Sequence, residues 1–124
     1  MRILVDIGNS RCKSAMEDED GLHPFETFAW KDVFLNEVLD EIWLKALGNK
    51  CPRSVHVSNV AGERLLPNMS AWCCKNFGVK PVAIQSTAEF QGLRNAYPEP
   101  ETFGVDRWAA MIGARSLYSG GLCV

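Results

Sequence analysis

Residues 2–13 read RILVDIGNSRCK, and their pattern is the most informative one about the architecture of the chain. Ile3, Leu4 and Val5 form a continuous apolar run, which is typical of a strand covered on both faces. Residues 6–10 (DIGNS) follow and are rich in turn-forming side chains. Residues 11–16 then return as an antiparallel partner. The stretch therefore predicts a buried strand, a turn and a second strand at the start of the chain.

The pattern downstream predicts a mixed α/β fold. Residues 22–29 read as a third strand that Pro24 places at an edge, which completes an antiparallel meander. The apolar period then changes to that of a helix over residues 32–48, whose apolar face should pack on the sheet. A strand, a helix and a strand follow, and Pro67 either kinks that helix or restarts it in a first turn. Their predicted ranges are 54–58, 62–77 and 80–85.

The last third of the chain contains an irregular segment and a helix. Residues 86–102 carry glycine, asparagine and proline without a period, which predicts a long loop or a broken helix. Residues 105–117 (VDRWAAMIGARSL) predict a helix that Gly120 and Gly121 follow. Residues 122–124 begin an apolar run like the start of a strand, so we expect the chain to be truncated after Val124.

Composition excludes several classes of protein. The 124 residues are 47% hydrophobic and 23% charged with a net charge of −2, which favours one small folded domain over disorder. No apolar run reaches the roughly 18 residues of a membrane-spanning helix, and no signal peptide is evident. Lys and Arg are scattered among acids, which argues against general nucleic-acid binding. We therefore expect a cytoplasmic protein that binds neither membrane nor nucleic acid.

The cysteines form no metal-binding or disulfide pattern. Five is an odd number, and without a secretory signal such a set reads as reduced thiols. Neither the adjacent cysteines nor the two histidines have the spacing of a zinc site. The thiols are Cys12, Cys51, Cys73, Cys74 and Cys123.

A first group of polar residues lies where the first strand ends. Gly8 lets backbone N–H groups face an anion, Asn9 and Ser10 are short donors, and Lys13 is a cation for phosphate oxygens. Asp6 would repel phosphate alone but suits a Mg²⁺ ion that bridges phosphate oxygens. The alternative is an ordinary hairpin turn, because the same residue types are common in turns.

A second group, Gly104-Val105-Asp106-Arg107, lies where the last helix begins. Phosphoryl transfer to an alcohol needs a carboxylate that accepts the hydroxyl proton, and an Arg can bind a carboxylate on the acceptor. The alternative is an acid stabilised by the helix dipole and paired with its neighbour. Taken without the first group, that structural interpretation is favoured.

Both groups, together with residues 92–97 (GLRNAY) and Trp108, resemble the type III pantothenate kinases of the sugar kinase, actin and heat-shock ATPase superfamily. The resemblance spans nearly the whole chain, although residues in the middle third match only in pattern. It implies a ribonuclease H-like α/β fold and one lobe of an actin-like ATPase. It also implies ATP-dependent phosphorylation of pantothenate, the first step of coenzyme A biosynthesis, in a cytoplasmic homodimer that uses Mg²⁺ and a monovalent cation, K⁺ or NH₄⁺.

The resemblance assigns roles to single residues. Asp6, Gly8, Asn9, Ser10 and Lys13 would bind ATP phosphates, with Asp6 near the Mg²⁺ ion, directly or through water. Asp106 would be the base that takes the hydroxyl proton of pantothenate, and Arg107 would meet its carboxylate. The other residues expected to contact pantothenate are Tyr97, Gly104 and Val105.

Two departures from the family limit what the chain alone is expected to do. The second phosphate motif, which supplies the monovalent cation ligand, and the second lobe would lie beyond Val124, so residues 1–124 are expected to be an inactive N-terminal lobe. Residues 58–61 (SNVA) match the family only loosely and receive no role. A non-catalytic regulatory or binding protein of the same fold is the alternative to an enzyme.

Overall fold

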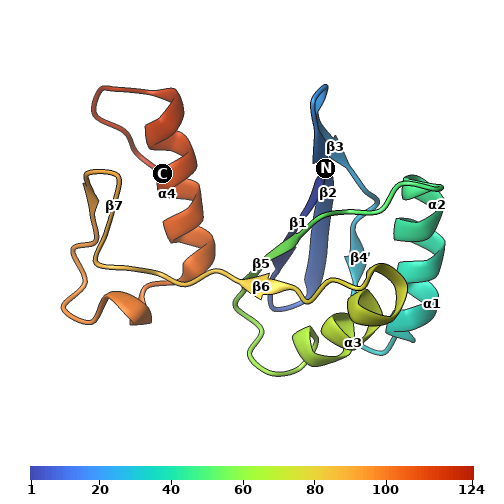
Figure 1. The fold of residues 1–124 in the computed structure, drawn as a ribbon. Helices are drawn as coiled ribbons and strands as arrows, with labels where there is room; N and C mark the ends of the chain where they lie inside the picture. The colour runs from blue at the N-terminus through green and yellow to red at the C-terminus, as the bar shows by residue number, and fades with distance from the viewer. The chain divides into compact units, whose positions relative to one another are not determined.

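A computed structural model describes residues 1–124. The chain forms two compact units, unit 1 (Met1–Ala83) and unit 2 (Ile84–Val124), which are described separately (Figure 1). The expectation that residues 1–124 make up one lobe of a kinase stays a prediction. None of the helices combines the length and the apolar character that crossing a membrane requires.

Unit 1 is built on a mixed six-stranded sheet, which confirms the predicted α/β class. The strand order is β3-β2-β1-β5-β6, and β4 also pairs with β2. The pairs β1–β2, β2–β3 and β2–β4 are antiparallel, whereas β1–β5 and β5–β6 are parallel. The strands are β1 (Arg2–Ile7), β2 (Arg11–Asp18), β3 (Gly21–Pro24), β4 (Phe28–Ala29), β5 (Val55–Asn59) and β6 (Val82–Ala83).

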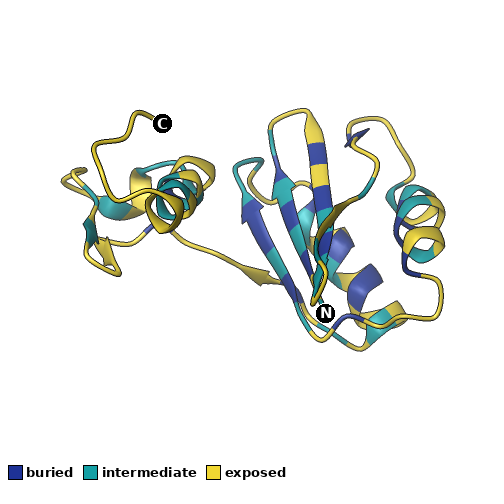
Figure 2. Cartoon of the chain, turned by 90° about the horizontal axis from the view of Figure 1, so that it is seen from above, coloured by how far each residue is buried: buried dark blue, intermediate teal, exposed yellow.

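One face of this sheet carries the core of unit 1. Burial alternates along β1, so that Ile3, Val5 and Ile7 are buried while Leu4 and Asp6 are only half-buried. Figure 2 shows such alternation of buried and less buried positions along strands of the sheet. The expectation of a strand fully covered on both faces is therefore wrong. The apolar run at residues 3–5 has one side in the core and the other side only partly covered.

Helices cover the core face, as the apolar period of residues 32–48 predicts. The predicted helix begins at Leu35, because Asp32 has a positive φ of 59°, and it contains a π-helical turn. Leu39, Trp43 and Leu47 project from it into the core. The helical elements of unit 1 are α1 (Leu35–Leu39), η1 (Asp40–Leu44), α2 (Lys45–Leu47) and α3 (Leu66–Phe77).

Three other predicted elements of unit 1 differ clearly in extent or continuity from those of the structure. The third strand is interrupted at residues 25–27 and becomes the separate strands β3 and β4, with β3 at the sheet edge as expected. The second helix starts at Leu66 with Pro67 in its first turn, which supports the restart over the kink. The strand predicted at residues 80–85 shortens to β6, because only its first two apolar residues pair with β5.

Unit 2 consists of a hairpin, a 3₁₀ turn and a helix. The predicted irregular segment contains strands β7 (Glu89–Phe90) and β8 (Leu93–Arg94), which pair around Gln91 and Gly92, both with positive φ. The 3₁₀ turn η2 (Pro100–Thr102) precedes α4 (Val105–Leu117), whose bounds match the prediction. Residues 122–124 adopt no regular structure, so no strand forms there within the chain.

Candidate functional site

Trp30, the residue after β4, makes two hydrogen bonds to the turn between β1 and β2. Gly8 N donates a hydrogen bond to Arg11 O at 2.9 Å, which closes the turn. Trp30 Nε1 donates to Gly8 O at 2.8 Å, and Trp30 N donates to Ser10 O at 3.3 Å. Trp30 is itself buried in the core. The backbone of residues 8–10 is therefore held from one side, while Asn9 and Ser10 are exposed.

Asp6 and Lys13, which the sequence places seven residues apart, are directly opposite each other in the β1–β2 ladder. Residues opposite each other in a ladder have side chains on the same face. Asp6 is half-buried, Lys13 is exposed, and neither takes part in an ion pair. A carboxylate and an ammonium group are thus both free for a ligand beside the turn.

Ser58, which lies in a segment that matches the family only loosely, is the partner of Asp6 on the other side of β1. The parallel β1–β5 register aligns Asp6 with Ser58, so Lys13, Asp6 and Ser58 form one row across three strands. Ser58 is 8% exposed, and its Oγ has no hydrogen-bond partner and almost no contact with solvent. No signal in the sequence could find this residue, because the row depends on the register between distant strands.

The thiol next to this row stays neutral. Cys12 is fully buried on the core side of β2. Burial, and to a smaller extent the Asp6 carboxylate, raise the pKa of the Cys12 thiol to about 12. The charges at the turn are therefore those of Asp6, Arg11 and Lys13 alone.

Gly8 leaves room above the turn. A Cβ added at this position would lie 3.4 Å from Arg11 O, an ordinary contact, and the backbone has no positive φ there. The fold alone therefore does not demand glycine at position 8. A close approach of a ligand to the backbone is a reason for glycine that fits the predicted phosphate contact.

Unit 2 holds the second predicted group, and Asn95 organises the loop that precedes it. Asn95 Nδ2 donates to Thr87 O at 3.2 Å and to Pro100 O at 3.1 Å. Its Oδ1 accepts a hydrogen bond from Tyr97 N at 3.1 Å. One side chain thereby connects the segment before the hairpin, residue 97 and the 3₁₀ turn.

Aromatic rings connect Tyr97 to the start of α4. The rings of Tyr97 and Phe103 lie 4.7 Å apart, and those of Phe103 and Trp108 lie 6.4 Å apart. Trp108 is buried, whereas Tyr97 is 44% exposed. The predicted substrate residue Tyr97 therefore packs against Phe103, which precedes Gly104 in the sequence.

The carboxylate of Asp106 is folded back over the start of α4. Asp106 Oδ1 accepts a hydrogen bond from Arg107 N at 2.9 Å, and a Cβ added at Gly104 would lie only 2.8 Å from that same oxygen. Asp106 and Arg107 are exposed, and Val105 is half-buried. Glycine at position 104 is thus explained by the position of the carboxylate.

The structure brings the predicted residues together in two sets, one in each unit. Residues 6–13 form the first set, and Tyr97 with residues 104–107 forms the second. The oxygen donors and the cation of the first set have the chemistry that a magnesium-bound phosphate requires, and the unpartnered Ser58 Oγ beside Asp6 adds a free hydroxyl. Trp30 and Ser58 are the two residues of this region that the sequence analysis missed.

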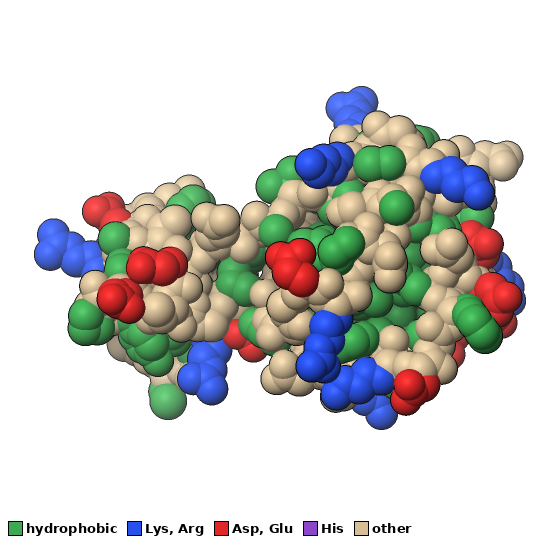
Figure 3. Space-filling view, turned by 90° about the horizontal axis from the view of Figure 1, so that it is seen from below, with side chains coloured by type: hydrophobic (Ala, Val, Ile, Leu, Met, Phe, Trp, Pro, Cys, Tyr) green, Lys and Arg blue, Asp and Glu red, His purple; other side chains and the backbone are tan.

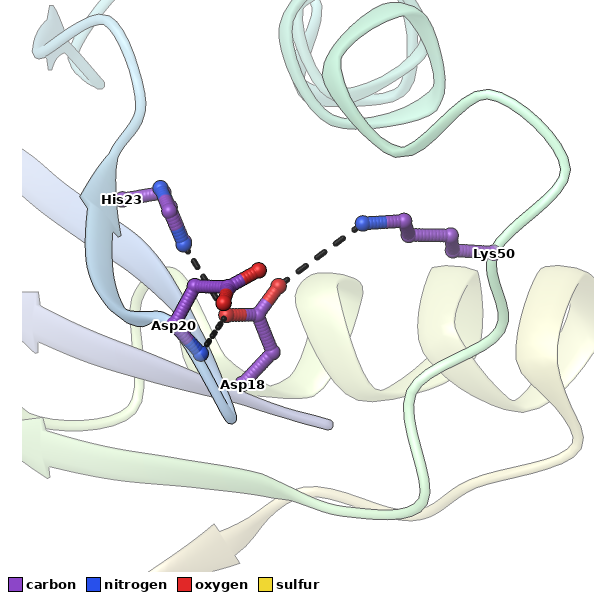
Figure 4. Close-up of polar contacts among 4 residues, drawn as sticks. All are labelled: Asp18, Asp20, His23 and Lys50. Carbon is purple, nitrogen blue, oxygen red and sulfur yellow. Dashed lines mark hydrogen bonds and ion pairs between the residues drawn. The ribbon is translucent and has the colours of Figure 1, made fainter.

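Other polar features of unit 1 lie outside the predicted sites. At the end of the β1–β2 hairpin far from the turn, Asp18 Oδ1 accepts hydrogen bonds from Asp20 N at 3.0 Å and interacts with His23 Nε2 at 2.9 Å, while Lys50 Nζ lies 3.7 Å from Oδ2 (Figure 4). These contacts lower the pKa of Asp18, with the His23 hydrogen bond as the largest cause. The face in Figure 3 shows charges of both signs interspersed.

A hollow in unit 1 does not coincide with the predicted residues. A groove of about 710 Å³ lies between α1 and α3 and is lined by side chains such as Phe34, Asp40 and Lys75. None of residues 6–13 contributes to it. The free charges, rather than a cavity, distinguish the strand-end turn.

Comparisons with known proteins agree on one family. The family described as Type III pantothenate kinase matches residues 2–124. A protein of Nitrosococcus oceani named type III pantothenate kinase is 33% identical over 121 residues, which cover 98% of this chain and 44% of that protein. One of Janthinobacterium sp. with the same name is 37% identical over 128 residues, covering 98% of this chain and 48% of the relative.

A third relative gives the same picture of coverage. The type III pantothenate kinase of Halorhodospira halophila is 31% identical over 134 residues, which cover 100% of this chain and 50% of that protein. The chain therefore spans about half the length of the curated relatives that it matches, and corresponds to their N-terminal part.

Proposed function

Because the chain belongs to the type III pantothenate kinase family, we propose that it serves in the ATP-dependent phosphorylation of pantothenate to 4′-phosphopantothenate, the first step of coenzyme A biosynthesis. One structural observation supports this proposal in addition to the family match. Asp6 and Lys13 are adjacent, free of ion pairs and next to a glycine turn, which is the arrangement that a magnesium-bound phosphate needs. An ordinary hairpin would be expected to pair such opposite charges with each other.

In this proposal the first set of residues binds the phosphates of ATP. Backbone groups of Gly8, the side chains of Asn9 and Ser10, and the Lys13 ammonium face the phosphate oxygens. Asp6 holds Mg²⁺ directly or through water. The Mg²⁺ ion, when bound, neutralises charge on the phosphate oxygens.

The second set of residues binds pantothenate and removes its proton. Asp106 accepts the proton of the attacking hydroxyl group, which makes the oxygen a better nucleophile for the γ-phosphorus. Arg107 binds the pantothenate carboxylate, because a guanidinium can donate two parallel hydrogen bonds to it. Tyr97, Gly104 and Val105 contact the rest of the substrate.

The resemblance to this family also suggests a fold, an oligomeric state and a monovalent cation, which are proposed here. We propose a ribonuclease H-like fold, with residues 1–124 in one lobe of an actin-like ATPase, and a cytoplasmic homodimer that uses K⁺ or NH₄⁺. The strand order β3-β2-β1-β5-β6, in which an antiparallel meander is joined to parallel strands, supports the ribonuclease H-like fold. Light scattering tests the dimer, and comparison of activity in KCl and NaCl tests the monovalent cation.

The direct test measures ATP consumption by the full-length protein with and without pantothenate, together with the mass of the product. We expect consumption only with pantothenate. We also expect Asp106→Asn to lower kcat by about 10²-fold or more, because a positioned base contributes at least that much. Glu101→Gln is the matched control, because Glu101 is an exposed acid in the same unit outside the predicted set.

Two outcomes would contradict the proposal. Equal ATP consumption with and without pantothenate would identify another acceptor, and its complete absence under both conditions would favour a non-catalytic binding protein. Full activity of Asp106→Asn would remove Asp106 from the role of base but leave the reaction in place.

A further inference from the structure

The strongest unexplained feature of unit 1 is the hydroxyl of Ser58. Its Oγ has almost no contact with solvent and no hydrogen-bond partner. A buried polar group without a partner loses its hydrogen bonds to water on folding, so such groups are rare and call for a reason. The other buried serine of the sheet shows the usual situation, because Ser14 Oγ accepts a hydrogen bond from Trp43 Nε1 at 3.0 Å.

The register determines which group faces Ser58. Val55 and Val57 of β5 are fully buried in the core, so Ser58 lies on the opposite face of the sheet, with Asp6 as its partner on β1. The next residue in the row is Lys13 on β2. The Asp6 carboxylate therefore lies on the same face of the sheet as the Ser58 hydroxyl, at the paired position of the neighbouring strand.

We infer that Ser58 is a positioning residue of the phosphate site, whose hydroxyl donates a hydrogen bond to the Asp6 carboxylate when a magnesium-bound nucleotide is present. The inference rests on the proposed function and adds a residue to its site. A carboxylate that approaches a metal through one oxygen has a second oxygen free to accept a hydrogen bond, and such a bond fixes its orientation. Lys13 remains available to the phosphates, because Asp6 is oriented from the side of β5.

The inference predicts opposite effects of Ser58 on stability and on binding. In the protein without ligand, Ser58→Ala removes an unpartnered polar group and is expected to leave the thermal midpoint unchanged or to raise it. In the magnesium–nucleotide complex, the same change removes a hydrogen bond to a charged group. We expect about tenfold weaker binding of a non-hydrolysable ATP analogue in the presence of Mg²⁺.

The experiment uses titration calorimetry and thermal unfolding of the full-length protein. Ser14→Ala is the matched control and is expected to show the reverse, a lower midpoint with unchanged nucleotide affinity, because it loses the bond from Trp43. Ser58→Thr and Ser58→Val add the same volume and differ in the hydroxyl alone. We expect the threonine variant to bind the magnesium–nucleotide more tightly than the valine variant.

The outcomes separate this inference from the proposed function. The unmodified protein is titrated first, and absence of Mg²⁺-dependent nucleotide binding would overturn both. If it binds nucleotide and phosphorylates pantothenate, while Ser58→Ala binds nucleotide with unchanged affinity, only the role of Ser58 is wrong. A lower thermal midpoint of ligand-free Ser58→Ala would also overturn the inference, because it would indicate a structural role for the hydroxyl.

Discussion

The turn at residues 8–10 and the helix start at residues 104–107 are both glycine-containing polar segments, but different forces hold them. The turn joins two strands of a sheet whose one face is a core of buried side chains, and Trp30 bonds to it from that core. The helix start belongs to a small unit in which Trp108 is the one buried hydrophobic side chain. In that unit, the Asn95 side chain bonds to Pro100 O in the preceding 3₁₀ turn, and the Asp106 carboxylate bonds to Arg107 N at the helix start.

This difference predicts how each segment responds to substitution. A change at Trp30, which bonds to the turn from the core, should lower stability and weaken ligand binding together. A change near the helix start should move a single carboxylate while the fold persists.

The largest effect is expected at the helix start, from Gly104→Ala. The new Cβ would lie 2.8 Å from Asp106 Oδ1, so the carboxylate must move while the helix remains. Because displacement of a reacting group by about 1 Å can cost 10²-fold in rate, we expect kcat to fall by up to about that factor with little change in thermal midpoint. Steady-state kinetics with varied pantothenate provides the measurement.

Gly113→Ala controls for the same substitution in the same helix, because a Cβ added there meets nothing within 4 Å. It should retain activity and gain up to about 1 kcal/mol of stability from higher helix propensity. Gly8→Ala makes the same substitution in the strand-end turn. It should raise KM for ATP, because the new methyl group lies where the phosphates are expected to approach the backbone. An unchanged kcat in Gly104→Ala would show that the observed Asp106 position is unimportant for catalysis.

A smaller effect is expected from Trp30→Phe, which tests whether the core holds the turn. The variant keeps an aromatic ring and loses the hydrogen bond from Nε1 to Gly8 O. We expect a loss of about 1 kcal/mol in the free energy of unfolding, and binding of the magnesium–nucleotide weakened a few-fold. Urea unfolding and calorimetry measure the two quantities.

Trp72→Phe is the matched variant for this experiment. It loses the bond from Nε1 to Asp40 Oδ1, which lies in the helical layer away from the strand-end turn. We expect a comparable loss of stability with unchanged nucleotide affinity. If both tryptophan variants weakened nucleotide binding equally, the turn would depend on general stability instead of on Trp30.

The smallest effect is expected at Asp18, which lies at the end of the β1–β2 hairpin opposite the turn. Its contacts lower the pKa of Asp18 in the folded state, so the stabilisation is present above the unfolded pKa of about 4 and is lost as the pH falls through the folded value. Unfolding measured from pH 6 down to pH 2 should therefore show a shallower acid loss for Asp18→Asn. Asp20→Asn is the control, because Asp20 contacts Asp18 through its backbone N–H, which the substitution retains.

Local patterns in the sequence were sufficient where neighbouring residues decide the structure. The helix at residues 105–117 has the predicted bounds, because its apolar period and its flanking glycines act within a few residues. The hairpin at residues 89–94 was missed, since its strands have two residues each and leave no alternation to detect. The π-helical turn at residues 40–44 was missed as well, because the same apolar period is compatible with a regular helix.

The candidate sites divide in the same way. The residue types at positions 6–13 and 104–107 were sufficient to predict phosphate and proton chemistry, because those types and their order carry the chemical groups. The roles of Trp30 and Ser58 could not be predicted, since each depends on a partner 22 or 52 positions away along the chain, at Gly8 and Asp6.

The α/β class, the helix at residues 105–117 and the family could be inferred from the amino-acid sequence, because periodicity and ordered motifs are properties of the chain. Folding was needed to reveal that Asp6 and Lys13 lie opposite each other without pairing, that Trp30 holds the turn, and that the Ser58 hydroxyl is buried without a partner. Strand register and burial bring together residues whose separation in the sequence carries no trace of their contact.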